Sequence, residues 1–212
     1  MKYNLYVEDV SVEAVFNKLG GLEGARAFLR GEQKLAPVEF ERNEHGHIVL
    51  TVTGLDLTGE QEVERLTAAG FRVNDWAKSC LLSTKEDGYN KAHRLVSRQS
   101  YKIALMPMQE IEGGVDRTTD AMRKRGIEKY GYEKPLAGIV PRIRESVSDK
   151  QMEEMGFWYI AAPHDPIGDS DDGPRVLYAN RDINGQSLFT SLDRPGRHWH
   201  GDGAFAFFVP AS

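Results

Sequence analysis

The sequence predicts an α+β fold, because helical and strand-like patterns dominate different parts of the chain. Residues 1–88 are mainly helical in spacing with one strand pair, so we expect a helical N-terminal unit that contains a β-hairpin. Residues 100–212 end in four strand-like runs, and we expect a C-terminal unit with a helix packed on an antiparallel sheet. The polar segment between these ranges is the expected boundary. A chain of 212 residues is long enough for two small domains.

The first unit is expected to open with two helices. The first begins at Ser11 as its cap and ends at Gly20, and the second, in "LEGARAFLRGE", closes at Gly31. The segment "VEFERNEHGHIVLTVTGLDL" alternates apolar and polar residues around a turn at 43–46, which predicts the hairpin. The two histidines of this turn, His45 and His47, are expected to be exposed.

Two further helices are expected before residue 88. Thr58 is the predicted cap of the helix in "TGEQEVERLTAAGF", and Asn74 or Asp75 caps the helix in "VNDWAKSCLLS". Trp76 and Cys80 are expected to face the core, where Cys80 acts as a small apolar side chain. Each helix therefore has a start signal of its own.

The second unit is expected to begin with a strand in "YKIALMPMQEI" and a helix in "GGVDRTTDAMRKRGIEKYGY". The segment "PLAGIVP" is bounded by prolines and is expected to be extended or turned, whereas Ser148 caps a short helix. Strands follow in "FWYIAAP", "PRVLYANRD", "QSLFTSLD" and "AFAFFVP". The dipeptide Asn184-Gly185 between the second and third of these strands predicts a tight hairpin turn.

Composition excludes several classes of protein. The formal net charge of −5 disfavours general nucleic-acid binding, and a single cysteine excludes an intrachain disulfide. The segment "MKYNLYVEDVSVEAVF" lacks an apolar stretch of signal-peptide length, and no run of apolar residues is long enough to span a bilayer. We therefore expect a soluble cytoplasmic protein that does not contact a membrane. A weaker alternative is nucleic-acid binding through Arg94, Arg98 and Lys102.

Several segments together resemble a group of uncharacterised bacterial proteins from candidate-phylum and metagenomic genomes. They are "KLGGLEGARAFLRGE", "AAGFRVNDWAKSCL", "PLAGIVPRIRE", the Trp-rich and Asp-Gly-rich stretch from Gly156 to His200, and "AFAFFVP". The resemblance covers most of the chain. It implies a shared fold and no particular activity.

The candidate site centres on "RPGRHWHGDGAF", residues 194–205, in which tryptophan and arginine stand in a glycine-rich loop. Such side chains are common anchors of binding surfaces. We therefore favour a soluble, non-catalytic binding protein with a protein or small-molecule partner and no cofactor. The expected binding residues are Trp158, Tyr159, His164, Arg197, His198, Trp199 and His200.

The main alternative is a metal-dependent enzyme of the hydrolase or oxygenase type. In an extended segment His198, His200 and Asp202 point to one side and are suitable ligands for a divalent metal. The prolines and glycines of the same stretch argue against simple extended geometry. They favour a loop that packs over the end of a sheet through Trp199.

Overall fold

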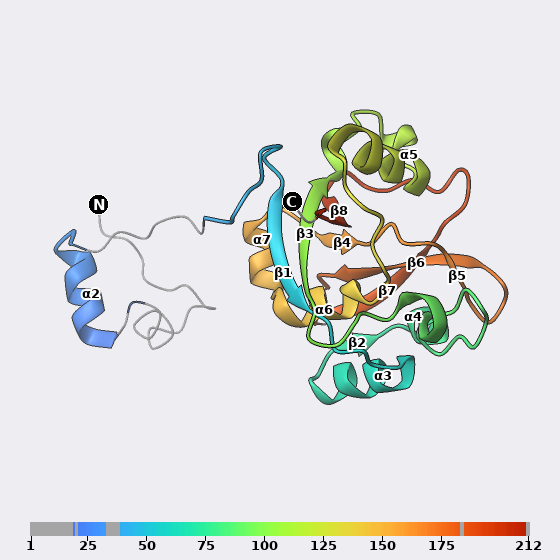
Figure 1. Ribbon diagram of the computed structural model, residues 1–212. Helices are drawn as coiled ribbons and strands as arrows, with labels where there is room; N and C mark the ends of the chain where they lie inside the picture. Colours follow the sequence, from blue (N-terminus) through green and yellow to red (C-terminus); the bar gives the residue numbers. More distant parts are fainter. Residues whose placement is uncertain (1–18, 20, 33–38, 183–184, 211–212) are drawn as a thin grey trace. The chain divides into compact units, whose positions relative to one another are not determined.

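The computed structural model describes residues 19, 21–32, 39–182 and 185–210 (Figure 1). The chain divides into two compact units, Met1–Glu39 and Phe40–Ser212. In the first unit the structure describes one helix, α2 (Gly21–Leu29). This helix closes at Gly31 as expected, where a φ of 73° lets the Glu32 N–H donate to the Ala27 carbonyl. The helix expected from Ser11 lies outside the described residues.

The second unit is built around one mixed sheet with the strand order β1-β3-β8-β4-β6-β7-β2, and β5 pairs with β6 beside this path. The pairs β4–β8 and β2–β7 are parallel and the other pairs are antiparallel. The strands are β1 (Ile48–Thr53), β2 (Arg72–Val73), β3 (Ser100–Pro107), β4 (Tyr159–Ala161), β5 (Ile167–Gly168), β6 (Pro174–Asn180), β7 (Ser187–Leu192) and β8 (Gly203–Phe208). The expected α+β class is confirmed.

Helices cover both faces of this sheet (Figure 1). The longer helical segments are α3 (Gly59–Ala68), α4 (Asp75–Leu81), η1 (Tyr89–His93), α5 (Thr119–Lys124), η4 (Arg125–Lys129), α6 (Ile139–Ser146) and α7 (Asp149–Glu154). Two short 3-10 turns, η2 (Met108–Glu110) and η3 (Gly114–Asp116), follow β3. The caps expected at Thr58, Asn74 and Ser148 are confirmed, because each side chain accepts a hydrogen bond from a backbone N–H in the first turn of its helix.

Alternation along the strands produces two separate hydrophobic clusters, one on each face of the sheet. On β8, Ala204 and Ala206 face the cluster formed with α3, α4, α6 and α7, whereas Phe205 and Phe207 face the cluster formed with α5. On β4, Ile160 belongs to the first cluster and Tyr159 to the second. The second face carries the candidate site.

The sheet crosses the expected boundary between residues 1–88 and 100–212. β1 pairs with β3 and β2 pairs with β7, so strands from the expected first unit complete the sheet of the expected second unit. The expected hairpin is reduced to a single antiparallel bridge between Arg42 and Ile48. The strand after its turn, β1, pairs with β3 instead. Local alternation identifies strands, but it does not say which strands pair.

Two segments of the second unit differ from the secondary structure expected from sequence. The stretch expected to form one helix after residue 113 begins with a separate short turn, η3, in which Val115 is 72% exposed. The helix proper starts at Thr119, and α5 continues directly into η4. The segment expected to be extended instead begins α6, with Pro141 in the first helical turn. Proline is tolerated there because the N–H groups of a first turn have no partner within the helix.

Candidate binding site

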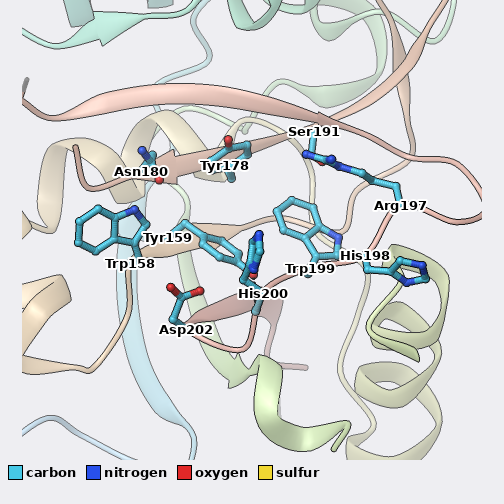
Figure 2. A pocket seen from close by; sticks show the side chains of 10 residues that line it. All are labelled: Trp158, Tyr159, Tyr178, Asn180, Ser191, Arg197, His198, Trp199, His200 and Asp202. Carbon is cyan, nitrogen blue, oxygen red and sulfur yellow. Dashed lines mark hydrogen bonds between the residues drawn. The ribbon is translucent and has the colours of Figure 1, made fainter. Parts of the chain in front are cut away.

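Six of the seven expected binding residues surround one cavity of about 340 Å³, which we call the aromatic pocket. The pocket lies on the second face of the sheet, where β4, β6 and β7 meet the loop 194–202. Its lining residues are Trp158, Tyr159, Tyr178, Asn180, Ser191, Arg197, His198, Trp199, His200 and Asp202 (Figure 2).

Strand register brings the floor residues of the pocket together. Tyr159 on β4 stands opposite Asn180 on β6, and Tyr178 lies two residues earlier on the same face of β6. On β7, Ser191 stands opposite Val176, which shares that face. Three neighbouring strands therefore supply the floor, and the loop supplies the rim.

Trp199 fixes the loop to the sheet. Its side chain is only 7% exposed, and its ring centroid lies 5.3 Å from that of Tyr159 and 5.7 Å from that of Tyr178. The indole N–H donates to the Thr119 hydroxyl over 3.1 Å, and the backbone N–H of Trp199 donates to the Arg117 carbonyl over 2.8 Å. These contacts are those of the packed loop that its glycines, prolines and tryptophan predicted.

Tyr159 is held by its hydroxyl and by a glycine. The hydroxyl donates to the His200 carbonyl over 2.6 Å. The ring lies over Gly203, where a Cβ atom would come within 2.3 Å of ring carbons. Burial, with the nearby charge of Asp202 as a smaller cause, raises the pKa of Tyr159 far above its usual value. The phenol is therefore a neutral hydrogen-bond donor at physiological pH.

Trp158 forms one edge of the pocket. It is 41% exposed, and the Arg181 guanidinium lies 4.5 Å from its ring centroid. Its backbone N–H donates to the Asp202 carbonyl over 2.6 Å. The edge tryptophan and the edge carboxylate are therefore held beside each other by a backbone hydrogen bond.

Opposite charges stand on opposite sides of the pocket. Figure 2 shows Arg197 on one side of the Tyr159 and Trp199 rings and Asp202 on the other. The Arg197 Nε donates to the Ser191 hydroxyl over 3.3 Å. Neither Arg197 nor Asp202 forms an ion pair with another residue of the part of the chain that the structure describes. Both charges remain available to a ligand.

The proposed metal ligands are not gathered into a coordination site. Among the described residues, no group of three or more His, Cys, Asp or Glu side chains is placed to hold a metal ion. The His198 ring points away from the His200 ring (Figure 2). The expectation of a shared side assumed an extended segment, whereas turns at 195–196 and 201–202 bound this one.

His164 lies in the core and does not line the pocket. Its Nδ1 contacts the Asp165 carbonyl over 2.6 Å, and its Nε2 accepts from the Leu177 N–H over 2.9 Å. Full burial, and then the neighbouring His93, lower the pKa of His164 to about 3. The imidazole is a neutral structural group, so its place in the expected binding surface is wrong.

Two other sequence expectations also change. His47 is buried, with its Nδ1 2.7 Å from the Tyr132 hydroxyl, although both turn histidines were expected to be exposed. In the basic segment considered for nucleic acid, Arg94 pairs with Asp56 and Lys102 pairs with Glu41. The charge offered to a phosphate backbone by these residues is reduced accordingly.

Sequence reasoning missed Tyr178, Asn180 and Ser191 as pocket residues. A signal for two of them was present, because Tyr178 and Asn180 share parity in "VLYAN" and therefore share a face. Ser191 required the β6–β7 register, in which it pairs with Val176. The order of the strands, with β8 beside β4, had no local signal.

A comparison with protein-family models, curated proteins and solved structures found no match. The resemblance to uncharacterised bacterial proteins therefore stays a prediction. Among the helices that the structure describes, none has the length and apolar character needed to cross a membrane.

Proposed function

We propose that this chain is a non-catalytic binding protein that holds a small organic ligand in the aromatic pocket. The observation that carries the proposal is the pocket itself, in which a rigid aromatic floor lies between charged side chains that have no ion-pair partner. Concave sites lined by aromatic side chains and a few polar groups are the usual form of small-molecule sites. A volume of about 340 Å³ suits a ligand of one or two rings.

The rigidity of the aromatic rings in the pocket supports binding, because a preformed site loses little conformational entropy when the ligand enters. Trp199 is held by two hydrogen bonds to the segment 117–119, and Tyr159 is held by the His200 carbonyl. Neither ring needs to be ordered by the ligand.

The chemistry of the hydroxyl groups supports recognition over acid–base catalysis. Burial raises the pKa of Tyr178 as it does that of Tyr159, although the Arg197 charge opposes the shift at Tyr178. Both phenols stay protonated at neutral pH and act as hydrogen-bond donors. The Ser191 hydroxyl already accepts from Arg197.

The proposal is tested with a library of monocyclic and bicyclic aromatic compounds, screened by saturation-transfer NMR against the wild-type chain. The chain offers a matched pair of variants. Trp158 and Trp76 are 41% and 39% exposed, and each lies under an arginine, but only Trp158 lines the pocket. Binding is expected to be lost in Trp158→Ala and kept in Trp76→Ala. A library without a single saturable binder, or equal loss in both variants, would overturn the proposal.

A further inference from the structure

We infer that the ligand of the aromatic pocket is bipolar, with a flat ring that carries an anionic group at one end and N–H donors at the other. This inference rests on the proposed function and adds the chemistry of the ligand. The anionic group binds Arg197, the ring lies against Tyr159 and Trp199, and the N–H donors bind Asp202.

Arg197 is suited to an anionic group. Its Nε is oriented by the Ser191 hydroxyl at 3.3 Å, and its terminal amino groups donate to no other described residue. A guanidinium presents paired N–H donors that match a carboxylate or a phosphate. The guanidinium charge acts on the Tyr178 hydroxyl of the floor and opposes the rise in its pKa. Arg197 itself is one of the residues that line the pocket (Figure 2).

Asp202 is suited to N–H donors. An ionised carboxylate only accepts hydrogen bonds, and no described residue donates to that of Asp202. Its backbone is fixed by the hydrogen bond from the Trp158 N–H. Asp202 lines the pocket, and its charge is near enough to raise the pKa of the Tyr159 hydroxyl. An amino group bound here also lies beside the aromatic ring of Trp158.

The arrangement favours a ligand with both groups over a ligand with one. An entirely anionic compound places charge against Asp202, and an entirely cationic compound places charge against Arg197. Like charges in contact are unfavourable in a partly desolvated site. The aromatic rings between the two charges favour a flat apolar spacer, because stacked rings gain contact area with little loss of entropy.

Two classes of ligand carry these groups at different separations, so both are tested. The shorter class is the aminoaryl carboxylates, with 4-aminobenzoate as the probe and with benzoate and aniline as single-group controls. The longer class is the nucleoside 5′-monophosphates, with AMP as the probe and with adenosine and ribose 5-phosphate as controls. Dissociation constants are measured by titration calorimetry at low ionic strength.

At least one of the two bipolar probes is expected to bind at least about tenfold more tightly than both of its single-group controls, because a hydrogen bond to a charged group contributes that order of affinity. In Arg197→Ala, the bipolar probes are expected to bind no more tightly than aniline or adenosine, which lack the anionic group. In Asp202→Ala, they are expected to bind no more tightly than benzoate or ribose 5-phosphate, which lack the amino group. Arg194→Ala is the matched control, since Arg194 is an exposed arginine of the same loop that does not line the pocket.

The two proposals fail in different ways. If probes or controls bind in a manner that depends on Trp158 but the bipolar probes gain nothing, the binding function stands and the bipolar ligand is wrong. If Arg194→Ala weakens the probes as much as Arg197→Ala does, Arg197 is not the anion contact. If no compound of the library binds, the binding function and this inference both fail.

Discussion

Gly203 allows Tyr159 to lie flat against β8. Tyr159 and Gly203 stand opposite each other in the parallel pair β4–β8, and a Cβ at position 203 would come within 2.3 Å of the tyrosine ring. Gly203→Ala is therefore expected to displace the ring and destabilise the protein by about 1–3 kcal/mol, as overpacking in a core does. Urea unfolding measures the change.

The control for this prediction is Gly201→Ala in the same loop. A Cβ there comes no closer than 3.2 Å, to the end of the Arg117 side chain, whereas at position 203 it comes within 2.3 Å of the Tyr159 ring. We expect Gly203→Ala to lower the free energy of unfolding much more than Gly201→Ala does. Equal losses of stability at the two positions would show that the Tyr159 ring is not confined by Gly203.

His164 should make the stability of the protein depend on pH. Burial lowers its folded-state pKa to about 3, whereas an unfolded histidine has a pKa of about 6.5. Between these values the unfolded state binds more protons, so stability rises with pH from about 3 to 6.5 and then levels off. Burial lowers the pKa of His47 and His93 as well, with the same sign of contribution.

His164→Gln is expected to flatten this dependence in part, when urea midpoints are compared between pH 4.5 and 7. His200→Gln serves as the control, because His200 is exposed. If the slope of His164→Gln matched that of the wild type, the account of His164 as a neutral buried group would be wrong. The sequence around His164, "PHDP" at residues 163–166, did not predict this burial. The contact between His164 and His93 joins residues far apart in the sequence.

At the scale of elements, one side-chain hydrogen bond to α5, from the Trp199 indole to Thr119, helps to hold the loop between β7 and β8. Thr119→Val removes the acceptor of the Trp199 indole N–H and keeps the shape of the side chain. A buried donor without a partner costs about 1–3 kcal/mol, so lower stability and faster amide exchange in the loop are expected. Hydrogen exchange at residues 197–201 measures the second effect.

Thr190→Val on β7 is the matched control, because the Thr190 hydroxyl is buried without a hydrogen-bond partner among the described residues. Its removal is expected to leave stability unchanged or to increase it. If Thr190→Val lost as much stability as Thr119→Val, the Trp199 hydrogen bond would not be what holds the loop.

Elements with an uninterrupted apolar run were predictable from sequence, and elements broken by proline or glycine were not. The runs that became β3, β6 and β8 are continuously apolar, as expected of strands buried on both faces, and their successive side chains enter opposite clusters. The segment of α6 was misread because Pro141 breaks a helix interior but fits a first turn. Only the position of the helix start distinguishes the two cases.

At the scale of the whole molecule, residues 40–212 contain a complete sheet with a hydrophobic cluster on each face. A chain of residues 40–212 is expected to unfold cooperatively with a Tm close to that of the full chain. A chain of residues 100–212 is expected not to fold, because β3 loses β1 and β7 loses β2. Calorimetry measures the unfolding transition of each chain. If residues 100–212 folded on their own, the division into units 1–88 and 100–212 expected from sequence would be correct.

The pocket could be predicted from sequence only in part. Its loop was recognisable, since arginine, tryptophan and histidines stand together between glycines. Its floor was not, because Tyr159, Tyr178 and Ser191 meet only through the strand order β8-β4-β6-β7. That order is set by pairing between strands far apart in the sequence. Two of the pairs, β2–β7 and β4–β8, are parallel, and a parallel pair cannot be formed by a hairpin.

The most direct test of the central claim maps bound 4-aminobenzoate and AMP by NMR on the isotopically labelled protein. Binding in the aromatic pocket predicts saturable shifts at the amides of Trp158, Tyr159, Tyr178 and residues 197–203, with those of α4 on the opposite face unchanged. Shifts centred elsewhere, or no saturable shift from either compound, would contradict the account.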